Sequence, residues 1–289
     1  MNDTANITLV LGGTGKTGRR VAERLTARGV PIRVGSRLGE PPFDWDNPTS
    51  WAAALQNVAS VYITFYPDLA IPGTAATIHA FANLAVQHGV RRLVLLSGRG
   101  EDEAQLCERV VQESGAEWTI LRASWFAQNF SENFLLEAVL SGEVALPAGN
   151  VGEPFIDADD IADVAVAALT EDGHAGQLYE LTGPRLLTFA EAVGEIASAT
   201  GQDVRYMQVS HEQFAAALAE QAVPADIVAL MAYLFTTVLD GRNAHLTDGV
   251  QRALGRAPRD FRVYARDVAA TGGWRTEEVE QVGLVGLSS

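Results

Sequence analysis

Three glycines and a lysine stand where a short apolar strand is expected to end. Residues 9–18 read Leu-Val-Leu-Gly-Gly-Thr-Gly-Lys-Thr-Gly. Gly12 permits a sharp turn, Gly15 lets a pyrophosphate approach the backbone, and Gly18 lets the next helix pack close to the strand. The free N–H groups at the start of that helix then face the phosphates. This pattern predicts a dinucleotide-binding loop, and its spacing differs from that of a P-loop, which has four residues between its glycines.

The end of the next expected strand indicates which dinucleotide is bound. Residues 31–35 form this strand, and Ser36-Arg37 follows it. An NAD site usually has an acid there for the ribose 2′-hydroxyl, whereas an NADP site has an arginine for the 2′-phosphate. The planar guanidinium of Arg37 suits a phosphate, and the Ser36 hydroxyl adds a donor. The sequence therefore favours NADP(H), against the alternative of a solvated surface arginine.

Helical and strand-like segments alternate along the first two thirds of the chain. This alternation predicts an α/β fold, a Rossmann-type doubly wound parallel sheet with helices on both faces. Cofactor and substrate should then meet at the carboxyl ends of the strands. The expected strands are 31–35, 60–65, 92–96, 117–122 and 178–181, with a short strand at 155–156, and the expected helices are 16–28, 74–88, 101–114 and 161–170, the last capped by Asp159 and Asp160.

The last hundred residues have a different pattern. Helices are expected at 189–200, 211–221 and 224–239, with a strand at 204–209 between the first two. We expect a cofactor-binding domain at 1–155, with sheet elements returning at about 156–182. A smaller, mainly helical substrate-binding portion should follow at 183–289.

Composition restricts the classes of partner. The formal net charge is −15, and a nucleic-acid partner would require a basic face. The first six residues are polar and lack the features of a signal peptide, and the apolar-rich run 227–239 is too short to span a bilayer. Cys107 is the single cysteine, and no two of the five histidines have a metal-ligand spacing. We therefore expect a cytoplasmic protein without nucleic-acid, membrane or metal partners; a homodimer stays open.

Six motifs along the chain resemble those of a known family. With the glycine loop and Ser36-Arg37, the segments 95–101 (LLSGRGE), 118–130 (WTILRASWFAQNF), 155–162 (FIDADDIA) and 179–184 (YELTGP) resemble the NmrA-like branch of the atypical short-chain dehydrogenases/reductases. Within it, the chain is most similar to the subgroup of agroclavine dehydrogenase-like ergot-alkaloid reductases. The resemblance covers residues 7 to about 210.

The resemblance implies a set of site residues. Asp44 matches the acid that meets the adenine after the third strand, Thr64 to Pro67 would line the ribose, and Ser97, Gly98 and Arg99 would lie near the nicotinamide. Phe126 and Phe130 are one helical turn apart, so plain core positions are an equal alternative to substrate contact for them. The implied cofactor-binding residues are Gly12, Thr14, Gly15, Lys16, Thr17, Gly18, Ser36, Arg37, Asp44, Thr64, Tyr66, Ser97, Gly98 and Arg99, and the implied substrate-binding residues are Trp125, Phe126, Asn129 and Phe130.

The chain departs from the wider superfamily in its acid–base residues. Most short-chain dehydrogenases use Tyr-x-x-x-Lys, in which the ammonium lowers the pKa of the tyrosine hydroxyl. Lys16 is the only lysine of the sequence, so none of the six tyrosines can have that partner. Tyr66, Ser97 or water remain as proton donors, although Ser97 could instead be a strand-end hydroxyl bonded to backbone.

Three functions agree with this departure. The first is an NADPH-dependent reductase of an imine, iminium or quinone-like small organic substrate, whose electron-poor carbon accepts hydride when the two are held together. The second is a redox sensor that binds NADP(H) without turnover and acts on a protein partner, as the namesake of the branch does. The third is a sugar-nucleotide epimerase, which normally needs the missing pair. The apolar residues around Phe214 and Phe235 suit a lid over an organic substrate, which favours the first function.

Overall fold

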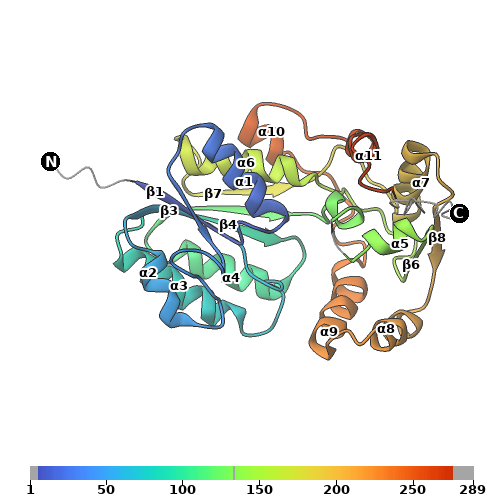
Figure 1. Cartoon of the computed structure of the whole chain (residues 1–289), viewed down its shortest axis with the longest axis horizontal. Coiled ribbons are helices and arrows are strands. Elements are labelled where there is room, and N and C mark those ends of the chain that lie inside the picture. Colours follow the sequence, from blue (N-terminus) through green and yellow to red (C-terminus); the bar gives the residue numbers. More distant parts are fainter. Residues whose placement is uncertain (1–5, 133, 276–289) are drawn as a thin grey trace, which may run out of the picture.

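The computed structural model describes residues 6–132 and 134–275. A six-stranded sheet in the order β2-β1-β3-β4-β5-β7 forms its centre, and all of its strands are parallel (Figure 1). The order reverses at β1, so the crevice above β1 and β3 is the place where ligands of such sheets bind. The doubly wound α/β fold is confirmed. The strands are β1 (Ile7–Leu11), β2 (Ile32–Gly35), β3 (Val58–Ile63), β4 (Arg92–Gly98), β5 (Glu117–Ala123) and β7 (Gln177–Leu181).

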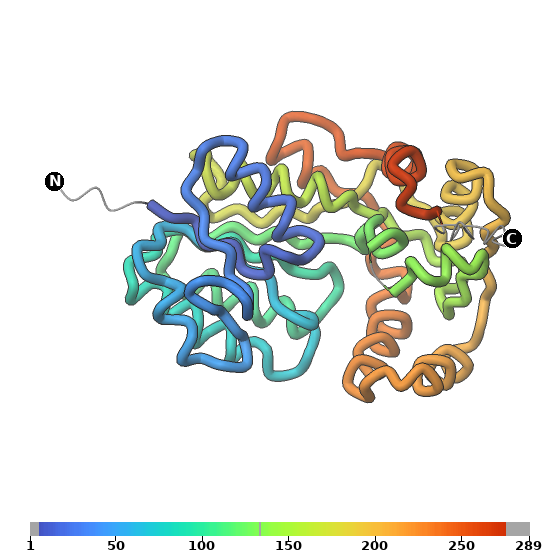
Figure 2. The backbone as a smooth tube through the Cα atoms, in the orientation of Figure 1, coloured from blue at the N-terminus to red at the C-terminus, as the bar shows by residue number. Residues whose placement is uncertain are grey.

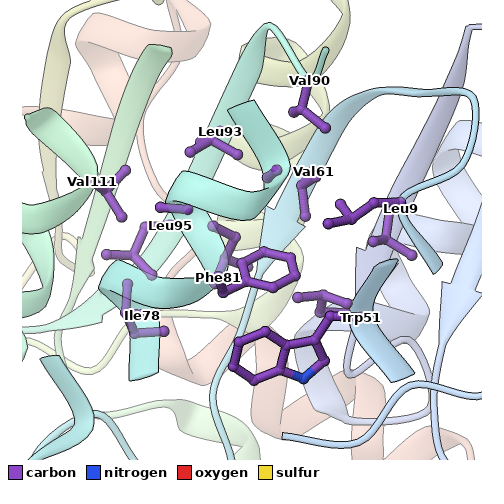
Figure 3. Close-up of a cluster of buried hydrophobic side chains, with 14 of the residues drawn as sticks. Leu9, Trp51, Val61, Ile78, Phe81, Val90, Leu93, Leu95 and Val111 are labelled. Atoms are coloured by element: carbon purple, nitrogen blue, oxygen red, sulfur yellow. The ribbon is translucent and has the colours of Figure 1, made fainter. Parts of the chain in front are cut away.

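Helices cover both faces of this sheet, which explains why its strands are apolar along their whole length. On β1, Leu9 and Leu11 belong to the core under α3 and α4, whereas Val10 packs with the core under α1 and α6. Figure 3 shows the first of these cores, where Phe81 lies among strand residues such as Val61. The helices are α1 (Lys16–Ala27) and α6 (Ala158–Thr170) on one face, and α2 (Trp51–Ala54), α3 (Thr74–Gln87) and α4 (Asp102–Gln112) on the other.

A second lobe lies beyond the carboxyl ends of the strands (Figure 1). Phe130, Phe189 and Trp274 are fully buried in its own hydrophobic core. Helices α8 and α9 form its lower end, and neither contains a buried residue (Figure 2). Its elements are α5 (Leu136–Leu140), β6 (Glu143–Leu146), α7 (Phe189–Thr200), β8 (Arg205–Gln208), α8 (His211–Glu220), α9 (Ala225–Tyr233), a π-helical turn (Leu234–Val238) and α11 (Phe261–Ala270), while α10 (Gly249–Leu254) returns to β7.

Packing does not follow the domain boundary expected at residue 155. Residues 127–155 contribute to the core of the second lobe, because β6 forms a parallel pair with β8, from Glu143 beside Arg205 to Leu146 beside Gln208. The chain therefore enters the second lobe directly after β5, returns to the sheet with α6 and β7, and then leaves again.

Two local expectations also need correction. Phe155 and Ile156 do not form a strand; Ile156 makes only an isolated bridge to Phe126. Helix α6 begins at Ala158, and its cap is Asp157, whose side chain accepts from the Asp159 N–H. Asp159 and Asp160 lie in the first turn, where the helix dipole stabilises their negative charges.

None of the helices within 6–132 and 134–275 combines the length and the apolar character needed to cross a membrane.

Candidate active site

The predicted dinucleotide loop joins β1 to α1 at the switch point. Gly12 has a positive φ of 61°, and a Cβ atom on Gly18 would lie 2.2 Å from the Gly12 carbonyl oxygen. Only glycine fits at these two positions of the loop. Gly15 caps α1 without any side-chain bond to the helix N–H groups, while Thr14 and Gly15 are exposed and Thr17 is buried. The loop thus offers free backbone donors at a helix N-terminus, which fits a pyrophosphate.

Thr64, at the end of β3, holds this loop in place from the neighbouring strand. Its hydroxyl donates to the Leu11 carbonyl at 3.0 Å, and its own carbonyl accepts from the Trp45 indole N–H at 3.0 Å. A Cβ on Gly12 would lie 2.3 Å from the Thr64 hydroxyl oxygen. The structure therefore brings Thr64 against the loop, with its hydroxyl already engaged by the protein.

The residues after β2 lie beyond the carboxyl end of that strand. Arg37 is exposed and makes no side-chain hydrogen bond or ion pair with the residues that the structure describes, and Ser36 is half-buried beside it. Asp44 follows in a loop, where its Oδ1 accepts from the Asp46 N–H at 3.1 Å. Asp44 precedes the third strand of the chain, β3, so it does not have the position after that strand that the resemblance implied.

Lys16 connects the dinucleotide loop with the aromatic segment after β5. Its ammonium donates to Asn129 Oδ1 at 2.8 Å and lies 5.8 Å from the centre of the Phe126 ring. Burial lowers the pKa of Lys16 to about 8, although Glu132 and Asp68 act in the opposite direction. The structure therefore places Asn129 and Phe126 beside the loop, in the region where a dinucleotide and a second ligand would meet.

The other two aromatic residues of this segment lie in the second lobe. Phe130 is 0% exposed, and its ring packs against Phe155, Phe189 and Phe261, which makes it a core residue. The core alternative is thus correct for Phe130. Trp125 is half-buried, and its ring centre lies 5.1 Å from that of Phe235 in the π-helical turn.

Ser97, a candidate proton donor, points away from the carboxyl end of the sheet. Its hydroxyl donates to Glu108 Oε1 of α4 at 2.7 Å, and the residue is 4% exposed. The same carboxylate pairs with Arg122, whose pKa it raises. Ser97 therefore stabilises a buried carboxylate, and this hydroxyl is not available to a substrate.

Arg99 is buried as well, and its guanidinium joins the two lobes. It donates to Ser124 Oγ at 3.1 Å and to the Asn243 carbonyl at 3.2 Å, and it lies 2.9 Å from His245 Nε2. Glu153 lies nearby and accepts from the Trp125 N–H, and burial raises the pKa of its carboxyl to about 7. The side chain of Arg99 is thus engaged by protein groups. Only its backbone is free to make the cofactor contact predicted at this position.

Tyr66 differs from Ser97 and Arg99 in that its side chain is not buried. It lies in the loop after β3, its side chain is exposed, and no described residue forms a hydrogen bond with its hydroxyl. The remaining tyrosines lie elsewhere in the fold; Tyr62, for example, is fully buried in β3. The structure places Tyr66 just beyond the carboxyl end of β3 with its side chain exposed.

Two acidic residues at the carboxyl ends of β3 and β4 were missed. Asp68 follows β3, and burial raises the pKa of its carboxyl although Lys16 acts in the opposite direction. Glu101 follows β4 and is 9% exposed; burial, Asp68 and Glu108 together raise the pKa of its carboxyl well above the usual range. Glu101 stands in the motif LLSGRGE, which is the signal that could have found it. Among the described residues, no group of three or more metal-ligating side chains lies close enough to hold a metal ion.

Comparisons with known proteins identify the family of the chain. Residues 42–172 match a family model described as NAD(P)H-binding. An uncharacterised oxidoreductase of Bacillus subtilis, YesF, is 32% identical over 277 residues, which is 92% of this chain and 96% of the relative. Agroclavine dehydrogenase of Claviceps fusiformis is 30% identical over 282 residues, 90% of this chain and 96% of the relative.

Solved structures of other proteins share this fold. The NADPH complex of the quinone oxidoreductase QOR2 from Escherichia coli superimposes with a TM-score of 0.72 at 21% identity, covering 91% of this chain and 99% of QOR2. This likeness supports the fold, while the two sequence relatives at 30% identity or more cover nearly the whole chain. The chain is a member of the NmrA-like family of NAD(P)H-binding oxidoreductases.

Proposed function

We propose that this oxidoreductase uses NADPH to reduce a small organic acceptor of the imine, iminium or quinone class. The acceptor would lie over Phe126 and Asn129, beside the dinucleotide loop. A bound reduced nicotinamide supplies a hydride to an electron-poor carbon or oxygen, and the protein contributes position, orientation and exclusion of water.

One observation carries this proposal most directly. Lys16 belongs to the dinucleotide loop, and its ammonium contacts both Asn129 and Phe126. A ligand above these two side chains is therefore adjacent to a cofactor held by Gly12 to Gly18. The names of the relatives agree with this substrate class, because they include agroclavine dehydrogenase and an NAD(P)H azoreductase, and a structural neighbour is a quinone oxidoreductase.

The preference for NADPH over NADH rests on Arg37. Its side chain is exposed at the end of β2, next to Ser36, and no acid in the described part of the chain pairs with it. A 2′-phosphate can therefore form a charge-assisted bond there without first breaking an ion pair.

The test combines cofactor binding with turnover. Purified protein is titrated with NADPH and NADH, and NADPH oxidation is then followed by nicotinamide absorbance with a panel of cyclic imines, iminium salts, quinones and enones. We expect tight NADPH binding and turnover of at least one class. Tight binding without turnover across the panel would contradict the proposed reaction and support the sensor function instead.

A further inference from the structure

The reduction of a neutral acceptor requires a proton as well as a hydride, and the residues predicted to supply it are poorly placed. Ser97 donates to Glu108, and the side chain of Tyr66 is exposed. Lys16 donates to Asn129 and is positioned for the dinucleotide. A different acidic group at the carboxyl ends of the strands is therefore needed.

Glu101 is such a group. It is 9% exposed, and its carboxyl forms no hydrogen bond with α4, which begins at the next residue, or with any other described side chain or backbone group. A Cβ on Gly98 would lie 2.1 Å from Glu101 Oε1, so the carboxyl rests directly on the backbone at the end of β4. The carboxyl oxygens keep contact with solvent, because Tyr62 Oη is the only fully buried side-chain nitrogen or oxygen atom without a partner among the described residues. At the ligand-binding edge of the sheet, a ligand can therefore reach this carboxyl.

The second lobe closes over the neighbourhood of Glu101. The hydroxyl of Tyr233 accepts from the Asp102 N–H at 3.2 Å, and Asn243 Nδ2 donates to the Arg99 carbonyl at 3.1 Å. These contacts fix the residues on both sides of Glu101. The carboxyl thus lies where the sheet edge, the start of α4 and the second lobe meet.

The charges around Glu101 keep a proton on it. Burial contributes most to its raised pKa, and the carboxylates of Asp68, from the loop after β3, and Glu108, from α4, raise the pKa further. Lys16 acts on Asp68 and favours the charged form of that residue, while Arg122 pairs with Glu108. Burial raises the pKa of both carboxyls, and Lys16 lowers it at Asp68 alone, so Glu101 is the acid of the pair that holds a proton more readily.

We propose that Glu101 donates the proton that accompanies hydride transfer to the acceptor. The acceptor gains a hydride with its electron pair at one end of its C=O or C=N bond. In an imine the hydride adds to the carbon, and the nitrogen bonds to the proton of Glu101. In a quinone the hydride adds to one oxygen, the π electrons shift through the ring, and the opposite oxygen bonds to the proton of Glu101 to give the hydroquinone. The dihydronicotinamide is oxidised, the acceptor is reduced, and the resulting Glu101 carboxylate takes a proton from water. This inference rests on the proposed function.

The test compares two kinds of acceptor. A neutral quinone needs a hydride and a proton, whereas an N-methyl dihydroisoquinolinium ion already carries its positive charge and needs the hydride alone. With the near-isosteric variant Glu101→Gln, we expect kcat for the quinone to fall about 100-fold and kcat for the iminium ion to stay within about threefold. Equal losses with both acceptors would contradict proton donation and indicate a structural role.

The neighbouring acid provides an independent measurement. Asp68→Asn removes a negative charge, so the alkaline limb of the pH profile of kcat with the quinone should move to lower pH. Glu103→Gln is the matched control, because this acid of α4 accepts from the Gly73 and Ala75 N–H groups and does not contribute to the raised pKa of Glu101. An unchanged profile in Asp68→Asn, or the same shift in both variants, would overturn the role of Asp68.

A readout without turnover completes the experiment. Infrared difference spectra of wild type against Glu101→Gln at about pH 7 should contain the carbonyl stretch of a protonated carboxyl, and the band should weaken in Asp68→Asn. An ionised carboxylate signal in its place would overturn the proposal even if the protein reduces quinones. Failure of the wild type to turn over either acceptor, with this band present, would instead contradict the proposed function.

Discussion

At the scale of single residues, some predicted site residues lie where they were expected, whereas the side chains of others point elsewhere. Gly12, Gly18 and Lys16 lie where their types require, because a glycine loop and a helix start depend on the local chain alone. Ser97 and Phe130 were assigned from motif position, but neighbours distant in sequence decide where they point. Glu101 was missed because its burial and its raised pKa come from tertiary contacts.

Arg37 provides a test of cofactor selection. Arg37→Ala should weaken NADPH binding by about 1.5–3 kcal/mol, because a charge-assisted bond to the 2′-phosphate is lost. NADH binding should hardly change. Isothermal titration with both cofactors measures the difference, with Arg205→Ala as a control at an exposed arginine of the second lobe. Equal weakening for both cofactors would remove the assignment.

At the scale of elements, most helices and strands were predictable, whereas helices α5, α10 and α11 and the pairing of β6 with β8 were not. The helices over 74–87 and 189–200 and the strands of the large sheet have clear apolar periodicity. The pairing of β6 with β8 joins residues about sixty positions apart, and each strand has four residues, so local pattern could not find the pair. Helices α5 and α10 are similarly short and depend on packing against other elements.

The capping of α6 is a test at this scale. Asp157 Oδ1 accepts from the Asp159 N–H and from the Gln128 side chain, both at 2.8 Å, so one carboxylate fixes both the helix start and the segment after β5. Asp157→Ala should lower the free energy of unfolding by about 1–3 kcal/mol. Asp157→Asn keeps an acceptor oxygen and should cost less. Urea denaturation of the two variants measures this, and equal losses would contradict the capping role.

At the scale of the whole molecule, buried charges join the two lobes. Arg99, at the end of β4, contacts Asn243 and His245, and Glu153 lies close by under the Trp125 backbone. A further ion pair, Arg20 with Glu132, connects α1 with the segment that leads from β5 into the second lobe. We therefore expect the lobes to unfold together, so a Rossmann domain ending at residue 155 would lack part of its support.

The pH dependence of stability tests this buried network. The pKa of Glu153 is raised to about 7 in the folded state, so the folded protein binds this proton more tightly than the unfolded chain. The free energy of unfolding should therefore fall as the pH rises from about 4.5 through 7, by up to about 3 kcal/mol from this group. Glu153→Gln removes the titration and should flatten the curve. Chemical denaturation at several pH values measures the slopes; parallel slopes in the two proteins would contradict the assignment.

Because the chain has a single lysine, one side chain can be labelled selectively for NMR. Reductive methylation with ¹³C-formaldehyde would label one side chain, Lys16, in addition to the α-amino group. Because the pKa of Lys16 is about 8, its methyl resonance should titrate well below the range of an ordinary lysine. Addition of NADPH should move this resonance, since the label lies in the dinucleotide loop and contacts Asn129. One NMR signal would then report the arrival of cofactor and acceptor separately, in a protein whose remaining basic side chains are arginines and histidines and do not react.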